Sequence, residues 1–148
     1  MIRIAIVEDN YKLLQNLIER IAKYEDIAVV FTALQGKEAL EKMEKLPVSQ
    51  IPEVVLMDIE MDKMNGIEAT KQLKNRFGEV EVLMLTVFDN DEKVFEAIKA
   101  GASGYLLKDE KTEKIYEAIE TLRNGGSLMS PSIARKVFNF LGKTSPKK

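Results

Sequence analysis

The sequence predicts an α/β fold built on a doubly wound, five-stranded parallel sheet of strand order 2-1-3-4-5. Runs of apolar, often β-branched residues alternate with amphipathic helical patterns five times before Asn124. These runs are apolar throughout, which is typical of parallel strands buried on both faces. Strict alternation of strands and helices implies right-handed crossovers, and these favour the doubly wound order.

Five segments have the composition of buried strands. They are Ile2–Val7, Ile27–Phe31, Val54–Met57, Val82–Thr86 and Ser103–Leu107. A closed βα barrel would need eight units and a longer chain. An open, flavodoxin-like (βα)5 sheet is therefore the economical arrangement.

The segments between the strands carry apolar stripes at helical spacing. The stripes are Leu13, Leu14, Leu17, Ile18 and Ile21 in the first, Ala39, Leu40 and Met43 in the second, Ile67, Thr70, Leu73 and Phe77 in the third, Val94, Phe95 and Ile98 in the fourth, and Ile115, Ile119 and Leu122 in the fifth. Asp89 and Glu92 predict a capping box at the start of the fourth helix, and Gly101 predicts a left-handed cap at its end.

The pattern changes after Gly126, so residues 1–124 are predicted to form one domain and residues 125–148 a linker with an extra helix at about 131–141. Ser130 and Pro131 suit the cap and the first turn, with Gly142 as the stop. Its apolar stripe of Ile133, Val137, Phe138 and Leu141 requires burial. It could contact an output domain or a second copy, or pack back on its own domain. The chain is either truncated or a natural single-domain protein.

The composition excludes several kinds of site. The chain has no Cys, no His and a net charge of −2. A Cys/His zinc site, a disulfide and a Ser–His or Cys–His nucleophile pair are excluded, and any metal must be held by oxygen. The charge lacks the basic excess of a stand-alone DNA binder. Neither a signal peptide nor a membrane-spanning segment is evident, so we expect a cytoplasmic protein without a membrane partner.

Polar residues stand at the carboxyl ends of four predicted strands. Glu8 and Asp9 follow the first strand, Asp58 follows the third, Thr86 ends the fourth and Lys108 follows the fifth. In the predicted order these strands are neighbours, so the side chains can point into one pocket. Each residue alone has a simpler explanation, because Asp9 or Asn10 could only cap a helix and Lys108 could be a surface charge.

The predicted cluster of carboxylates has an electrostatic consequence. Three carboxylates that lie close together repel one another, and a divalent cation relieves the repulsion. Oxygen ligands that leave coordination positions open favour Mg²⁺, which accepts phosphate oxygens. With the Lys108 ammonium and the Thr86 hydroxyl beside Asp58, the pocket suits phosphoryl transfer to that carboxylate.

Several segments resemble the receiver domains of bacterial two-component response regulators. They are Ile6–Asp9, Leu56–Met61, Asn65–Ala69, Met84–Thr86 and Gly101–Lys108. The resemblance covers residues 1 to about 124. The stretches 86–92, 105–109 and 130–137 are similar to the NarL/LuxR-type subfamily. Members of that subfamily carry a C-terminal helix-turn-helix DNA-binding domain, which this chain lacks.

The resemblance implies a role for each polar residue. Asp58 resembles the phospho-acceptor, and Glu8, Asp9 and the backbone carbonyl of Glu60 resemble the further Mg²⁺ ligands. Thr86 and Lys108 resemble the catalytic hydroxyl and lysine beside the phosphoryl group. Tyr105 resembles the switch aromatic that turns inward when Thr86 moves. Taken alone, Tyr105 could also be a half-buried sheet residue with its hydroxyl in water.

The function that the resemblance implies is a phosphorylation-activated signalling switch and not a turnover enzyme. A sensor histidine kinase would donate the phosphoryl group. The altered surface of the fourth helix, fifth strand and fifth helix would promote a homodimer or control an output domain. Through that domain, which is missing here, the switch would control DNA binding and transcription.

Two other functions are disfavoured. A phosphatase of the haloacid-dehalogenase kind needs a second Asp two residues after its nucleophile, where this chain has Glu60. A flavodoxin-like nucleotide-binding module needs a glycine-rich phosphate cradle after the first strand, where this chain has Glu8, Asp9 and Asn10.

Overall fold

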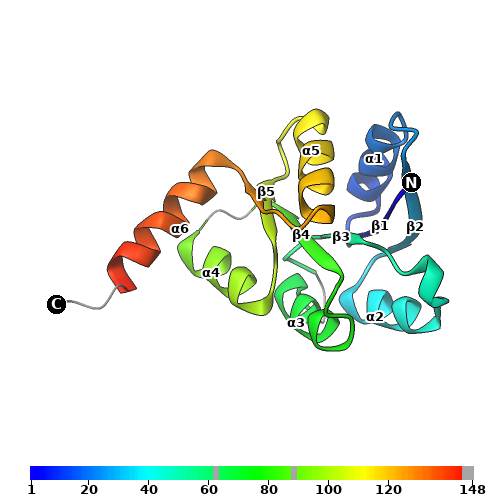
Figure 1. The fold of residues 1–148 in the computed structure, drawn as a ribbon, viewed down its shortest axis with the longest axis horizontal. Coiled ribbons are helices and arrows are strands. Elements are labelled where there is room, and N and C mark those ends of the chain that lie inside the picture. Colours follow the sequence, from blue (N-terminus) through cyan, green and yellow to red (C-terminus); the bar gives the residue numbers. More distant parts are fainter. Residues whose placement is uncertain (62–63, 88–89, 145–148) are drawn as a thin grey trace.

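In a computed structural model, the chain forms a six-stranded parallel sheet of order β2-β1-β3-β4-β5-β6 with helices on both faces (Figure 1). The structure describes residues 1–61, 64–87 and 90–144. In chain order the elements are β1 (Ile2–Val7), α1 (Tyr11–Ile21), β2 (Ile27–Ala33), α2 (Gly36–Lys45), a short 3₁₀ helix (Val48–Gln50), β3 (Val54–Met57), α3 (Gly66–Arg76), β4 (Glu81–Thr86), α4 (Asp91–Ala100), β5 (Gly104–Leu107), α5 (Thr112–Arg123), β6 (Leu128–Met129) and α6 (Pro131–Thr144).

The predicted fold class is confirmed, with one correction to the strand count. The first five strands have the predicted order, and all neighbouring pairs are parallel. The sixth strand, β6, pairs with β5 through Gly104 and Tyr105. It has two residues, too few to produce a periodic pattern in the sequence.

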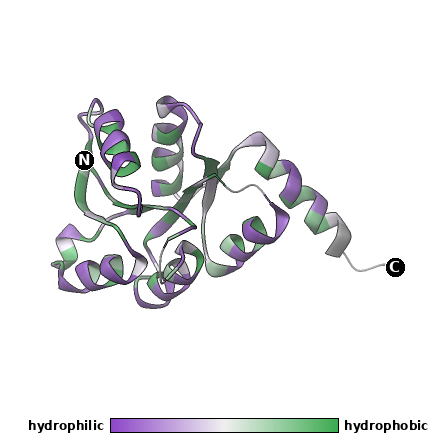
Figure 2. Cartoon of the chain, turned by 180° about the vertical axis from the view of Figure 1, so that it is seen from behind, coloured by the Kyte–Doolittle hydropathy of each residue, from purple (hydrophilic) through white to green (hydrophobic). Residues whose placement is uncertain are grey.

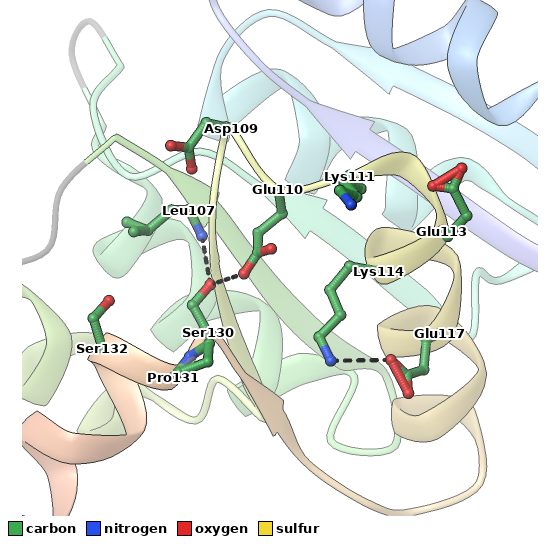
Figure 3. Close-up of a pocket in the computed structure, with 10 residues that line it drawn as sticks. All are labelled: Leu107, Asp109, Glu110, Lys111, Glu113, Lys114, Glu117, Ser130, Pro131 and Ser132. Atoms are coloured by element: carbon green, nitrogen blue, oxygen red, sulfur yellow. Dashed lines mark hydrogen bonds and ion pairs between the residues drawn. The ribbon is translucent and has the colours of Figure 1, made fainter.

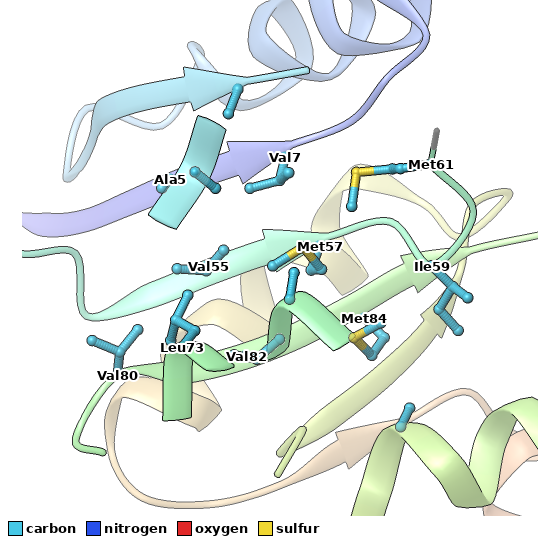
Figure 4. Close-up of a cluster of buried hydrophobic side chains, with 14 of the residues drawn as sticks. Ala5, Val7, Val55, Met57, Ile59, Met61, Leu73, Val80, Val82 and Met84 are labelled. Atoms are coloured by element: carbon cyan, nitrogen blue, oxygen red, sulfur yellow. The ribbon is translucent and has the colours of Figure 1, made fainter. Parts of the chain in front are cut away.

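The sheet separates two apolar clusters. Helices α1 and α5 cover one face, and α2, α3 and α4 cover the other (Figure 1). The helices α1 to α5 turn their apolar sides mainly toward the sheet and their polar sides outward (Figure 2). The α2–α4 side contains four buried methionines, Met43, Met57, Met61 and Met84. Figure 4 shows Met57, Met61 and Met84 packed among branched residues. Strands that are apolar on both faces therefore have helices on both sides, as predicted.

Asparagine caps three of the helices. Asn10, Asn65 and Asn90 have extended backbones, and each side-chain oxygen accepts the N–H three residues later, at 2.9 to 3.1 Å. This corrects the predicted cap of α4, which is Asn90 and not Asp89, a residue outside the described part of the chain. The capping box with Glu92 is therefore wrong.

The C-terminal helix α6 begins at Pro131 as predicted, but it continues through Gly142 to Thr144. Its predicted apolar stripe divides between two faces. Ile133 is buried and Val137 packs against the α2–α4 cluster, so one face packs back on the domain. Phe138 and Leu141 are exposed on the other face. Among the described residues, no helix is both long and apolar enough to cross a bilayer.

A pair of glycine substitutions checks this description of the helix ends. Gly101 ends α4 with φ of 113°, a conformation that side chains with a Cβ rarely adopt. We expect Gly101→Ala to lower the free energy of unfolding by about 1–2 kcal/mol. Gly142 lies inside α6 in open space, so Gly142→Ala is expected to be neutral or to stabilise by up to about 1 kcal/mol. Urea unfolding measures both, and equal losses would contradict the assignment.

Candidate functional site

The carboxyl ends of β1, β3, β4 and β5 lie next to one another at one end of the sheet. Val7 pairs with Met57 in register, and the Asp58 N–H donates to the Val7 carbonyl at 3.0 Å. On the other side of the site, the Lys108 N–H donates to the Thr86 carbonyl at 2.8 Å. The parallel register therefore brings together residues that are up to a hundred positions apart.

Three carboxylates converge at this end of the sheet. One oxygen from each of Glu8, Asp9 and Asp58 lies within 4.8 Å of the others. Glu8 and Asp58 are 5% and 6% exposed, whereas Asp9 is exposed. Of the described residues, these three form the one group of acidic side chains close enough to hold a metal ion.

The lysine predicted for the site lies between two of these carboxylates. The Lys108 ammonium is 3.3 Å from Asp58 Oδ2 and forms a close ion pair with Glu8. Burial lowers the pKa of Lys108, but its hydrogen bond to Glu8 and the charges of Asp58 and Glu8 outweigh burial, so the net shift is upward. Lys108 is therefore a permanent cation at neutral pH, held against the predicted acceptor.

The Asp58 carboxylate is electrostatically strained without a metal. Burial, and then the charge of Glu8, raise its pKa from 3.8 to about 6, although Lys108 opposes the shift. Because the other donors of the group, on Glu8 and Asp9, are also hard carboxylate oxygens, a divalent cation of the Mg²⁺ type suits the site. The donor set thus agrees with the predicted cofactor.

The simpler explanation of a helix cap is correct for Asn10, and that of a surface charge is wrong for Lys108. The Asn10 side chain caps α1, and its own N–H donates to Glu8 Oε2 at 3.0 Å. The side chain of Lys108 is 19% exposed and lies against two acids. Asp9 belongs to the carboxylate cluster, and Lys108 is paired with its other two members.

The two predicted switch residues are buried. Thr86 and Tyr105 are each 0% exposed, at the end of β4 and within β5. The alternative of a half-buried Tyr105 with its hydroxyl in water is therefore wrong. Tyr105 lies inward in the cluster that includes Ile133 of α6. Glu60, whose carbonyl is predicted to bind the metal, is exposed just beyond Asp58.

Two features of the site escaped prediction. An ideal Cβ at Gly66 would overlap the Asp58 carbonyl oxygen and lie 2.7 Å from its carbon, so only glycine fits there. The apolar stripe of α1 predicts a buried Leu13, but this residue is 45% exposed and lines a depression next to Lys108 with Val87.

Comparison with known proteins identifies the family. The response regulator receiver domain matches residues 4–120. This chain belongs to the response-regulator receiver family. The domain is thus the signalling receiver of a two-component system, as the resemblance implied.

Relatives and solved structures agree with this assignment. The receiver is 38% identical over 139 residues to the transcriptional regulatory protein LnrK of Bacillus subtilis (strain 168), covering 94% of this chain and 61% of LnrK. It is 36% identical over 141 residues to LiaR of the same organism, covering 95% and 65%. A LuxR-family regulator from Aurantimonas sp. SI85-9A1 superposes with a TM-score of 0.84 at 29% identity, covering 93% and 96%. The predicted subfamily is confirmed, and the receiver spans less than two thirds of these two curated relatives.

Proposed function

We propose that this receiver accepts a phosphoryl group on Asp58 from a phosphohistidine of a sensor kinase. The observation that carries the proposal is the convergence of Glu8, Asp9, Asp58 and Lys108 at one end of the sheet. A buried carboxylate with a fixed cation next to it is a nucleophile whose surroundings favour a phosphate group.

The reaction is a direct displacement at phosphorus. A carboxylate oxygen of Asp58 forms the new O–P bond while the P–N bond to the kinase imidazole breaks, and the electron pair of that bond stays on the imidazole nitrogen. Lys108 neutralises charge on the phosphoryl oxygens, and the Thr86 hydroxyl donates to one of them. Glu8, Asp9, Asp58 and the Glu60 carbonyl would hold Mg²⁺, which supplies further neutralisation of the phosphoryl oxygens.

The phosphorylated site then acts as a switch. Contact between Thr86 and the phosphoryl group, together with the inward position of Tyr105, favours one of two pre-existing conformations of the α4–β5–α5 surface. That surface would promote a homodimer or act on a DNA-binding domain in the whole protein, and so regulate transcription in the cytoplasm. The receiver itself turns over no separate substrate.

Intact mass after incubation with acetyl phosphate and Mg²⁺ tests the acceptor. We expect wild type to gain the mass of one phosphoryl group and Asp58→Asn to gain none. Asp26→Asn, a matched change on an exposed residue after α1, should gain as much as wild type. An unlabelled wild type, or equal labelling of Asp58→Asn, would refute the assignment.

Removal of the metal should stop the reaction. With EDTA in place of Mg²⁺, we expect labelling by acetyl phosphate to fall by at least tenfold, because the carboxylates then repel the incoming phosphate. Added Mg²⁺ should restore it. Labelling that is equally fast in EDTA would show that the acidic cluster needs no cation.

A further inference from the structure

The junction between β6 and α6 is fixed to β5 by one serine. Ser130 is 2% exposed, and its N–H donates to the Tyr105 carbonyl at 3.1 Å. Its hydroxyl accepts the Leu107 N–H at 3.2 Å and donates to the Glu110 carboxylate (Figure 3). Because β6 ends at Met129, the Ser130 hydroxyl supplies the acceptor that a longer strand would offer to Leu107.

The two bonds of the Ser130 hydroxyl lie on either side of Lys108 along the chain, and Lys108 faces the proposed phosphorylation site. Lys108 lies between Leu107 and Glu110, and both of these neighbours are bonded to the Ser130 hydroxyl. From the opposite side, Arg20 of α1 donates to the Glu110 carbonyl at 3.0 Å. The Lys108 loop (residues 108–111) is thus held between α1 and the start of α6.

Helix α6 also contacts α4, the helix that comes after Thr86 in the chain. Lys136 forms a 3.1 Å ion pair with Asp91 at the start of α4, and Phe140 stacks on Phe95 with ring centroids 3.8 Å apart. Ile133 packs in the cluster that buries Tyr105. Helix α6 therefore contacts α4, and Ser130, the residue just before α6, bonds to the loop that contains Lys108. Ile133 of α6 also helps to bury Tyr105.

We propose that Ser130 is a positioning residue that links the Lys108 loop to α6, so that anion binding at Asp58 and the docking of α6 on α4 are energetically coupled. The inference rests on the proposed function. Ser130 holds Lys108 in reach of the anion through Leu107 and Glu110. Because coupling is reciprocal, an anion that draws Lys108 toward Asp58 also changes the stability of α6 on α4.

The test measures beryllofluoride and Mg²⁺ affinities separately in the 148-residue protein. Beryllofluoride is the phosphomimetic in a solved structure of the isolated REC domain of RcsB from Salmonella enterica serovar Typhimurium. We expect Ser130→Ala to bind it about three- to tenfold more weakly, as for one lost hydrogen-bonding group. Mg²⁺ affinity should not fall, because the side-chain ligands lie after β1 and β3 and a loosened Lys108 ammonium competes less with the cation for Glu8 and Asp58. Ser130→Thr keeps the hydroxyl and should restore beryllofluoride binding.

Two further variants separate positioning from general damage. Ser132 is an exposed serine that lines the same surface pocket as Ser130 (Figure 3). Ser132→Ala is therefore the matched control and should bind both ligands like wild type. Glu110→Ala leaves the Leu107–Ser130 bond in place and should weaken beryllofluoride binding in the same direction. In wild type, beryllofluoride should change amide exchange in α6, and in Ser130→Ala this change should be lost.

The outcomes are distinct. Unchanged beryllofluoride affinity in both Ser130→Ala and Glu110→Ala would overturn the inference, and so would a parallel loss of Mg²⁺ affinity, which indicates only structural damage. If wild type gains a phosphoryl group from acetyl phosphate but exchange in α6 does not respond, the coupling is wrong and the proposed function stands. If wild type neither gains the group nor binds beryllofluoride, both fail.

Discussion

Gly66→Ala is expected to destabilise the protein by about 3 kcal/mol or more and to abolish phosphorylation of Asp58. The Cβ of alanine would overlap the backbone carbonyl of Asp58 and lie 2.9 Å from the Ile59 Cα. No side-chain rotation relieves a clash between two backbones, so either α3 or the segment after β3 must move. Asp58 would then move away from Glu8 and Lys108.

Gly78→Ala is the matched control for this change. Gly78 is exposed after α3, and its nearest neighbour, the Lys74 carbonyl oxygen, would be at an ordinary 3.5 Å from the new Cβ. Urea unfolding gives the stability, and intact mass after acetyl phosphate gives the labelling. A Gly66→Ala protein as stable and as readily labelled as Gly78→Ala would show that the close approach to Asp58 is unimportant.

Asp58→Asn is expected to stabilise the metal-free protein at pH 8 by about 1–3 kcal/mol. The pKa of Asp58 is raised from 3.8 to about 6 by burial and by Glu8, so the folded state disfavours the ionised carboxylate. Its protonated form contributes stability that is fully present below about pH 4 and is lost as the pH rises through about 6. Asparagine resembles the protonated form and avoids this loss.

Thermal unfolding in EDTA at pH 4, 6 and 8 measures the effect. The advantage of Asp58→Asn should be small at pH 4 and grow toward pH 8, while Glu41→Gln, at an exposed carboxylate on α2, should show no such trend. Mg²⁺ should stabilise wild type more than Asp58→Asn, because it binds the folded carboxylates. A variant less stable than wild type at pH 8 would contradict the raised pKa.

The sequence predicts the sheet and the acidic cluster for the same reason. Strands buried on both faces must be apolar along their length, so a charged residue such as Asp58 at the end of such a run marks the boundary of the sheet. Parallel pairing then brings those boundaries together at one end. Five strands and the convergence of Glu8, Asp9, Asp58 and Lys108 follow from this pattern.

Other features depend on contacts that no local pattern contains. The choice of Asn90 over Asp89 as a cap depends on backbone dihedrals, because both residue types suit the position. Gly142 lies within α6, where a glycine is unfavourable but packing of Ile133 and Phe140 on the domain stabilises the helix. The bonds of Ser130 to Leu107 and Glu110 span twenty residues or more. The fit of Gly66 against Asp58 exists only once α3 is docked.

The two-residue strand β6 has a consequence for the association of the chain. β5 would otherwise be the last strand of the sheet, and the outward N–H and C=O groups of this apolar strand would be open to pairing with another molecule. β6 pairs with Gly104 and Tyr105, and the Ser130 hydroxyl occupies the next N–H, of Leu107. Residues 128–130 therefore cover the hydrogen-bonding edge of β5. A chain ending at Arg123 would be prone to aggregate by strand-to-strand pairing.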